Sequence, residues 1–300
     1  MHISGLSPNT TYYARPYAIN SYGISYGNEI TFTTTETNVD SDSSENIVFA
    51  DDLMKELCVN AFDTNGDREL SFSEAAAVTD IRNMKLTDRS LEYFDEFQYF
   101  TGVTSVPSSY FKETEIKSIT LPKSITEIAD EAFCHCHNLS AINLSEALIS
   151  IGYRTFYYCT NLTDIIIPDS VTQIDYQAFN DCKGLKSVTL SNSLTELSGI
   201  FEGCSSLESI TIPDSVNEIS SYNFYNCTSL TSVTIPASVN RLGNYAFYGC
   251  SALKEIYLQS TVPPLLAKPY DGIYKIFAVN APDRKIYVPA GSAEAYKAAD

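Results

Sequence analysis

Apolar residues recur along about half of this chain in units of about 23 residues, and every unit repeats the same internal order. Each unit contains a short run in which apolar and polar positions alternate. Such alternation predicts a strand with one inward side, because successive side chains of a strand point to opposite faces. The inward pairs are Ile142/Leu144, Ile165/Ile167, Val188/Leu190, Ile210/Ile212, Val233/Ile235 and Ile256/Leu258.

A second apolar pair follows each predicted strand and leads to a phenylalanine. One unit cannot bury this many apolar side chains by itself, so neighbouring units are expected to stack as a solenoid. The second pairs are Ile125/Ile128, Leu148/Ile151, Val171/Ile174, Leu194/Leu197, Val216/Ile219 and Val239/Leu242.

A cysteine stands three residues after each repeat phenylalanine, and a leucine stands three residues after the cysteine. A cysteine in phase with two buried residues is expected to behave as a small buried hydrophobic residue with a free thiol. Stacked neighbours would also point their Cβ bonds in parallel, which disfavours disulfides. The states of Cys58 and Cys134, outside this series, stay open. The series is Cys136, Cys159, Cys182, Cys204, Cys227 and Cys250.

The unit C-x-x-L-x-x-I-x-I-P-x-S-V-x-x-I-x-x-x-A-F resembles the BspA-like subclass of leucine-rich repeats, which is found in bacterial and protozoan surface proteins. The resemblance runs from Phe111 to Leu258. Ser145 and Ser191 replace the usual proline in two units, and one unit is a residue shorter before Phe201. The resemblance implies a leucine-rich repeat solenoid, mainly β, with a right-handed superhelix.

Smaller parts are expected on both sides of the repeats. Leu6, Pro8, Thr10 and Tyr12 form an L-x-P-x-T-x-Y run that resembles the C-terminal part of a fibronectin type III domain. The earlier strands of that sandwich are missing, so we expect the chain to be a piece of a longer protein. An open solenoid end would expose apolar surface and strand edges, so caps are expected at both ends.

These patterns predict five parts of the chain. The N-terminal cap is expected to be helical, and the C-terminal cap to contain one more repeat strand near Ile286 and a short helix from Ser292 to Ala299. The parts are a fibronectin type III-like fragment (1–36), a linker (37–46), a helical cap (47–110), the repeats (111–258) and a C-terminal cap (259–300).

One segment of the predicted N-terminal cap has the spacing of a calcium loop and resembles an EF-hand or dockerin loop. Ca²⁺ prefers oxygen ligands at loop positions 1, 3, 5, 7, 9 and 12. Arg68 occupies position six, where glycine is usual, so a non-glycine residue would need a positive φ. The alternative is a degenerate loop that joins two helices without metal, with Asp63 and Ser71 as caps. The candidate ligands are Asp63, Asn65, Asp67, Glu69 (through its backbone carbonyl), Ser71 and Glu74.

The run Cys134-His135-Cys136-His137 carries groups that could bind zinc or act as nucleophiles. Adjacent residues alternate in direction, and Cys136 belongs to the inward series, so these groups are not expected to converge on a metal. No third group to orient a histidine can be named. The sequence therefore predicts no catalytic residue, and we expect that the chain is not an enzyme.

Two rows of surface residues are candidates for binding. Tyrosines beside the repeat phenylalanines predict an aromatic rim, which either covers the stack or contacts a sugar or a protein. The outward strand positions are mostly serine and threonine, and a partner is expected near the residues that interrupt them. The rim candidates are Tyr157, Tyr225 and Tyr248, and the strand candidates are Asp164, Ile166, Glu255 and Tyr257.

Composition narrows the possible partners. The formal net charge of −18 and the isoelectric point near 4.5 argue against nucleic acid and anionic membranes, which need clustered Lys and Arg. No apolar stretch approaches the length of a membrane span, and the first residues show no signal peptide pattern.

The BspA-like resemblance implies a non-enzymatic, extracellular or cell-surface scaffold of a bacterium that binds protein. Its partners would be host matrix proteins or other cell surfaces, and we expect a monomer. The alternative is a carbohydrate-recognition or accessory module of a surface glycan-degrading system, which the tyrosine rim and the dockerin-like loop suggest.

Overall fold

A computed structural model describes the N-terminal strands and residues 45–86, 88–267 and 275–299. The chain divides into two units, Met1–Ser44 and Glu45–Asp300. In the first unit, β1 (Thr11–Ala14) pairs antiparallel with β4 (Ile30–Thr33), and β2 (Tyr17–Asn20) pairs antiparallel with β3 (Gly23–Tyr26). Leu6, Pro8 and Thr10 of the fibronectin-like run lie outside the described residues.

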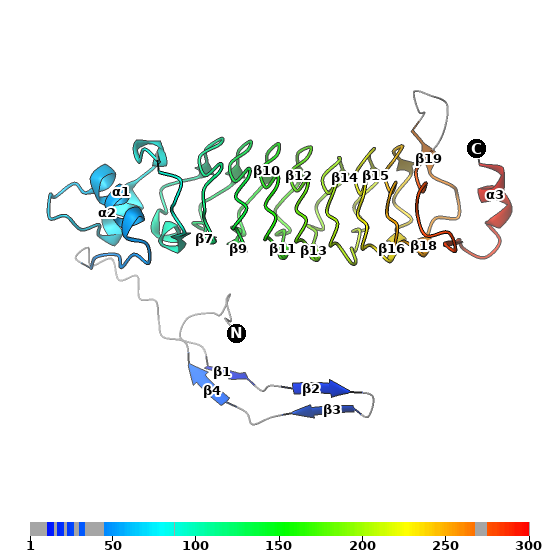
Figure 1. Cartoon of the computed structure of the whole chain (residues 1–300), viewed down its shortest axis with the longest axis horizontal. Helices are drawn as coiled ribbons and strands as arrows, with labels where there is room; N and C mark the ends of the chain where they lie inside the picture. Colours follow the sequence, from blue (N-terminus) through cyan, green and yellow to red (C-terminus); the bar gives the residue numbers. More distant parts are fainter. Residues whose placement is uncertain are drawn as a thin grey trace. The chain divides into compact units, whose positions relative to one another are not determined.

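The second unit contains a stack of parallel coils, and most coils contribute a short strand to each of two faces (Figure 1). The first strand face contains β5 (Tyr93–Phe94), β7 (Ser118–Thr120), β9 (Ala141–Asn143), β11 (Asp164–Ile166), β13 (Ser187–Thr189), β16 (Ser232–Ile235), β18 (Glu255–Leu258) and β20 (Lys285–Tyr287). The second strand face contains β6 (Ser105–Val106), β8 (Glu127–Ile128), β10 (Ser150–Ile151), β12 (Gln173–Ile174), β14 (Glu196–Leu197), β15 (Glu218–Ile219), β17 (Arg241–Leu242) and β19 (Leu265–Leu266).

Equivalent residues of successive coils pair with each other. Ile165 of β11 pairs with Val188 of β13, and Ile256 of β18 pairs with Ile286 of β20. The first strand face is interrupted at the coil of residues 209–212, where only Thr211 bridges to Thr234. The expected mainly β solenoid with repeats of about 23 residues is confirmed.

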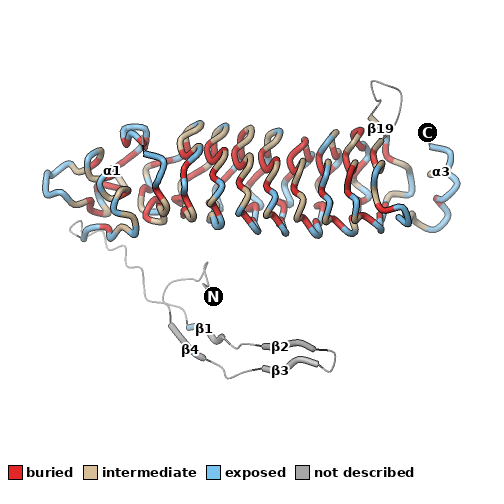
Figure 2. Tube along the Cα trace, viewed as in Figure 1, coloured by how far each residue is buried: buried red, intermediate tan, exposed pale blue. Residues whose placement is uncertain are grey.

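The interior of the stack holds the apolar members of each unit, as the buried positions along the coils show (Figure 2). The predicted inward pairs are buried, except that Ile142 and Leu144 are half-buried. The repeat phenylalanines stack ring on ring through the core, with centroids 5.1–5.8 Å apart and planes within 17° of parallel. Each ring therefore belongs to one continuous column from Phe111 to Phe277.

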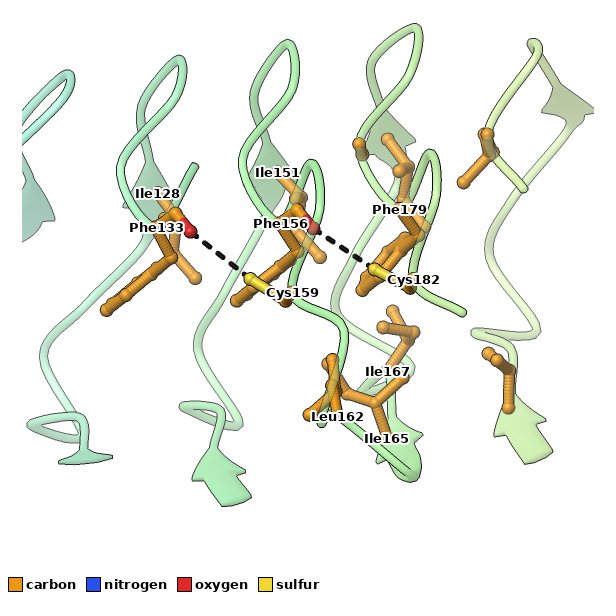
Figure 3. Packing of buried hydrophobic residues seen from close by; sticks show 14 of the residues in the cluster. Ile128, Phe133, Ile151, Phe156, Cys159, Leu162, Ile165, Ile167, Phe179 and Cys182 are labelled. Atoms are coloured by element: carbon orange, nitrogen blue, oxygen red, sulfur yellow. Dashed lines mark hydrogen bonds between the residues drawn. The ribbon is translucent and has the colours of Figure 1, made fainter. Parts of the chain in front are cut away.

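The cysteines have a specific partner in the neighbouring coil. Each thiol donates a hydrogen bond to the carbonyl oxygen of a phenylalanine in the preceding coil, as for Cys159 on Phe133 and Cys182 on Phe156 (Figure 3). The six Sγ to oxygen distances are 2.9–3.2 Å. All eight cysteines are free and buried, as expected for the series, and this includes Cys58 and Cys134.

The turn that carries each phenylalanine has a left-handed residue on either side of it. The residues two before and two after the ring have positive φ in most coils, as Arg154 and Tyr158 do around Phe156. Glycine occupies this position only at Gly199, Gly203 and Gly249. Many residue types occupy these positions, so the packing of the coils rather than the residue type imposes the left-handed conformation. Its local cost is about 1 kcal/mol for each non-glycine residue.

A tight turn follows most strands of the first face. The carbonyl of Pro168 accepts the N–H of Val171, and the other strand-closing prolines make the same bond. Ser145 and Ser191 keep this turn without proline. Their hydroxyls donate instead to carbonyls of the preceding coil, at 2.9 Å for Ser145 and 2.6 Å for Ser191. Neither substitution removes an inward apolar side chain.

The helical segment before the repeats covers the first coil. It contains α1 (Asp52–Phe62), α2 (Phe72–Ala77) and two 3₁₀ helices, η1 (Ile81–Asn83) and η2 (Asp95–Tyr99). The buried side of α1 carries Met54, Cys58 and Phe62, whereas Leu53 and Leu57 lie half-buried beside it. Phe94 and Phe97 both contact Phe111 with centroids 6.3 Å apart, so aromatic rings close this end of the phenylalanine column.

The last described coil continues the stack with altered residues. Phe277 stacks on Phe247 after a longer step, and Asn280 takes the place of a series cysteine. The Asn280 amide donates to the carbonyl of Phe247 at 3.1 Å, which is the bond that a thiol makes elsewhere. β20 pairs with β18, but Ile286 is 48% exposed at the end of the stack. The short helix α3 (Ala293–Ala298) buries no residue.

Candidate binding surfaces

Two of the predicted strand residues lie together in one hollow of the first strand face. Asp164 and Ile166 are the outward residues of β11, and Lys186, Ser187 and Thr189 of the next coil line the same hollow, whose volume is about 540 Å³. The Ile166 side chain is 71% exposed. A single exposed apolar residue is common on protein surfaces, so Ile166 is a candidate contact for a partner only together with the polar groups that line the same hollow.

The other predicted strand residues lie near the end of the same face. Tyr257 of β18 stacks against Tyr287 of β20, with centroids 4.6 Å apart and planes at 9°. Both rings line a second hollow of about 410 Å³, together with Thr234 and Gln259. Glu255 pairs in register with Lys285. Tyr287 was not among the predicted residues, because it lies beyond the regular repeats.

The rim tyrosines contact each other and nearby cations. The guanidinium of Arg154 lies 4.8 Å from the ring centre of Tyr157, and Tyr225 stacks on Tyr248 at 5.2 Å. Their rings therefore cover one another or a cation instead of offering both faces to solvent. All three predicted rim residues are half-buried, which suits tyrosines that cover the stack.

The loop from Asp63 to Glu74 is closed by its own hydrogen bonds. One carboxylate oxygen of Asp63 accepts the N–H groups of Asn65 and Gly66, and the other accepts the N–H of Arg68. The Asn65 side-chain oxygen accepts the N–H of Asp67, and its amide donates to the Asp67 carboxylate. Arg68, at position six of the loop, has a φ of +67°. This is the left-handed conformation that a calcium loop requires at that position.

The far end of the loop is a capping box. Ser71 is the N-cap of α2, and Glu74 accepts hydrogen bonds from Ser71 with one oxygen and from Thr64 with the other. Burial raises the pKa of Glu74, but these bonds outweigh it and lower the pKa to about 2. Glu69 pairs with Lys55 at 2.7 Å.

To bind calcium, the carboxylate oxygens of this loop would have to change some of their hydrogen-bond partners. Among residues 45–86, 88–267 and 275–299, no three His, Cys, Asp or Glu side chains converge to hold a metal ion. Asp63 and Glu74 would have to turn some of their oxygens from N–H groups to the ion. The loop is thus held by its own hydrogen bonds, and calcium binding stays a prediction.

The Cys134 to His137 run does not converge. Cys136 points into the core and donates to the carbonyl of Phe111, while His135 stacks on Tyr158 with centroids 5.1 Å apart. Burial raises the pKa of both Cys134 and Cys136 to about 11. A thiol is a nucleophile only as thiolate, so neither group is activated.

The helices in the described part of the chain do not combine the length and the hydrophobicity that a transmembrane helix requires.

Comparisons with solved structures show proteins with related coils. A leucine-rich cell surface protein from Faecalibacterium prausnitzii is 36% identical with a TM-score of 0.51, over 57% of this chain and 48% of that one. A leucine-rich repeat protein from Bacteroides ovatus is 24% identical with a TM-score of 0.47, over 63% and 59% of the two chains. The match therefore spans about half the length of the first protein. A search of curated proteins finds no match.

The family model described as the BspA type leucine-rich repeat region matches the sequence directly. Six copies match within residues 104–200 and 197–283, which is more than half of the chain. The matched residues include the phenylalanine column, the thiol series, the second strand face, and the first strand face except β5 and β20. The chain belongs to the BspA-type leucine-rich repeat family.

Proposed function

We propose that this chain is a non-enzymatic cell-surface scaffold that binds a protein partner on its first strand face. Its family supports the scaffold role, and a similar protein from Faecalibacterium prausnitzii is described as a cell surface protein. The partner would be a host matrix protein or a protein on another cell.

The observation that carries this proposal is the pair of hollows on one face. Each surrounds an exposed apolar or aromatic side chain, Ile166 in one and Tyr257 in the other. The strands β11 and β18 lie four coils apart, which at about 4.8 Å per coil separates the hollows by about 19 Å. Two such contacts in a surface of serine and threonine are typical of energetic centres in protein interfaces.

The stacked core makes this face a rigid platform. Each coil buries its phenylalanine and thiol against the next, so the outward strand residues are held at fixed spacing. Binding then orders few protein side chains, which limits the entropic cost of association. Asp164 and Lys186 line one hollow, and Glu255 accepts a hydrogen bond from Tyr257 of the other. These charges would select the partner rather than add much affinity.

The test is binding of the purified chain to a panel of fibronectin, laminin and collagen by biolayer interferometry. We expect at least one of them to bind, and the double variant Ile166→Ala/Tyr257→Ala to weaken that binding about tenfold or more. Thr211→Ala, on the same face but outside both hollows, should change nothing. Absence of binding, or binding insensitive to the double variant, would contradict the proposal.

Two finer assignments stay proposals beside this one. The first unit is proposed to be the end of a fibronectin type III domain, which the antiparallel pairs β1–β4 and β2–β3 support. The loop from Asp63 to Glu74 is proposed to bind Ca²⁺, which its spacing of oxygen side chains supports.

A further inference from the structure

One column of outward residues on the first strand face begins and ends with a large exposed side chain. Ile166 pairs in register with Thr189 of the next coil. Tyr257 pairs with Thr234, and Thr234 pairs with Thr211. Three exposed threonines therefore lie between Ile166 and Tyr257, and each of these two large side chains borders one of the two hollows. We call the outward residues from β11 to β18 the strip.

Hydroxyl groups of the strip are free to donate hydrogen bonds. In the described part of the chain, the exposed side chains of Ser187 and Thr189 have no hydrogen-bond partner. The equivalent pair on β7 is occupied, since Ser118 and Thr120 donate to the two carboxylate oxygens of Asp95 at 2.8 and 3.0 Å. Hydroxyl pairs of this face can thus hold acceptor oxygens of another segment. A partner that covers the free pair must supply such oxygens, because a buried hydroxyl without a partner is costly.

The charges around the strip disfavour carboxylates as those acceptors. The formal net charge of the chain is −18. Asp164 and Glu255 lie in the neighbouring outward column, at the same two coils as Ile166 and Tyr257. Neither carboxylate forms an ion pair within the described residues. A partner that combines neutral acceptor oxygens with basic side chains therefore fits the strip better than an acidic one.

A polyproline II chain has neutral acceptor oxygens at a matching spacing. Its carbonyl groups make no internal hydrogen bonds, and it repeats every three residues with a rise of about 3.1 Å per residue. Six residues, or two turns, span about 19 Å, which matches the about 19 Å between Ile166 and Tyr257. Six residues of a β-strand span about 20 Å, but their N–H groups would need acceptors that a strip of hydroxyls supplies poorly, whereas proline has no N–H.

We propose that the strip binds a single proline-rich chain that is in the polyproline II conformation and carries basic side chains. One row of prolines would contact Ile166 and Tyr257, whose ring is backed by Tyr287 at 4.6 Å, because aromatic side chains are the usual contacts of such chains. Basic residues of the adjacent row would lie beside Asp164 and Glu255. The site lies on the face of the proposed function, so it rests on that function and names the chemistry of the partner.

Fluorescence polarisation with a labelled peptide of sequence PRPPPPPRP, at low salt, tests the site. We expect saturable binding that falls about fivefold in Tyr257→Ala, through loss of an aromatic contact. Asp164→Lys should weaken binding about threefold or more, because it turns an attraction into a repulsion. Thr211→Ala, outside both hollows, and Glu127→Lys, which makes the same charge change on the second strand face, should bind the peptide as the wild type does.

Two control peptides separate polyproline II geometry from charge alone. PRPPPPRP, one proline shorter, turns one arginine by about 120° around the helix axis, and GRGSGSGRG carries the same charges on a flexible chain. Both should bind about threefold more weakly or worse. No binding of PRPPPPPRP, equal binding of either control peptide, or wild-type affinity in both Tyr257→Ala and Asp164→Lys would overturn the proposal. A matrix protein that binds the face and is not displaced by the peptide would also overturn it, while the proposed function would stand.

Discussion

Two adjacent isoleucines of β11 allow a direct test of the register of the solenoid. Ile165 points into the core and is 4% exposed, whereas Ile166 points outward and is 71% exposed. Replacing each by alanine makes the same chemical change at neighbouring positions of one strand. Any difference in stability between the two variants therefore reports burial, since the loss of strand propensity is common to both.

The expected magnitudes follow from these exposures. Removal of roughly three carbons at about 0.8 kcal/mol each makes about 2.4 kcal/mol for a fully buried side chain. Because Ile165 is almost fully buried, Ile165→Ala should lose nearly all of this transfer free energy and also leave a cavity. We therefore expect the free energy of unfolding to fall by about 3 kcal/mol, within the range of about 2–5 kcal/mol for such changes. Ile166→Ala should lose about 0.7 kcal/mol or less by the same arithmetic. The expected difference is about 2 kcal/mol.

Urea unfolding followed by circular dichroism and by tyrosine fluorescence measures these values. The chain has 21 tyrosines and no tryptophan, so the fluorescence reports tyrosines spread over many coils. Repeat arrays do not always unfold as one unit, so agreement of the two midpoints is part of the test. Equal losses for the two variants, or a larger loss for Ile166→Ala, would refute the assigned register.

Two further predictions concern the loop of the N-terminal segment. The pKa of Glu74 is lowered to about 2 in the folded state, so its stabilisation is present above pH about 4.5 and is lost as the pH falls toward 2. Glu74→Gln should therefore lower the urea midpoint at pH 7, with a difference that shrinks at pH 2.5; a difference independent of pH would contradict this assignment. Calorimetric titration with CaCl₂ should release or absorb heat in the wild type and give none in Asp63→Ala, and a silent wild type would end the calcium hypothesis.

The core could be predicted from the sequence because its signal is repeated. Phe179 and Cys204 are fully buried, as their phase in the repeats required. The ends of the column were harder to find. Phe277 follows Phe247 by 30 residues rather than 23, and Asn280 replaces a cysteine by making the same hydrogen bond with a different atom. A search for the same residue type at a fixed spacing cannot find such a substitution.

Other features were missed because they arise only when coils meet. Arg154 and Tyr222 take positive φ although neither residue type favours it, since hydrogen bonds between coils fix the backbone there. A hollow of about 360 Å³ beside the shortened unit is lined by Tyr176, Gly199 and Tyr222 from three successive coils. The missing residue was visible in the sequence, but the space that it leaves depends on how Tyr176 lies over Gly199.

Alkylation of the thiols tests the central claim most directly. The stacked coils and the helical segment before them bury all eight cysteines as free thiols, and burial raises their pKa values, as it does for Cys250 to about 12. Iodoacetamide should leave the native chain unmodified at pH 8, and mass spectrometry should find eight additions after unfolding in urea without a reducing agent. Labelling of the native fold, or fewer than eight additions after unfolding, would contradict the account.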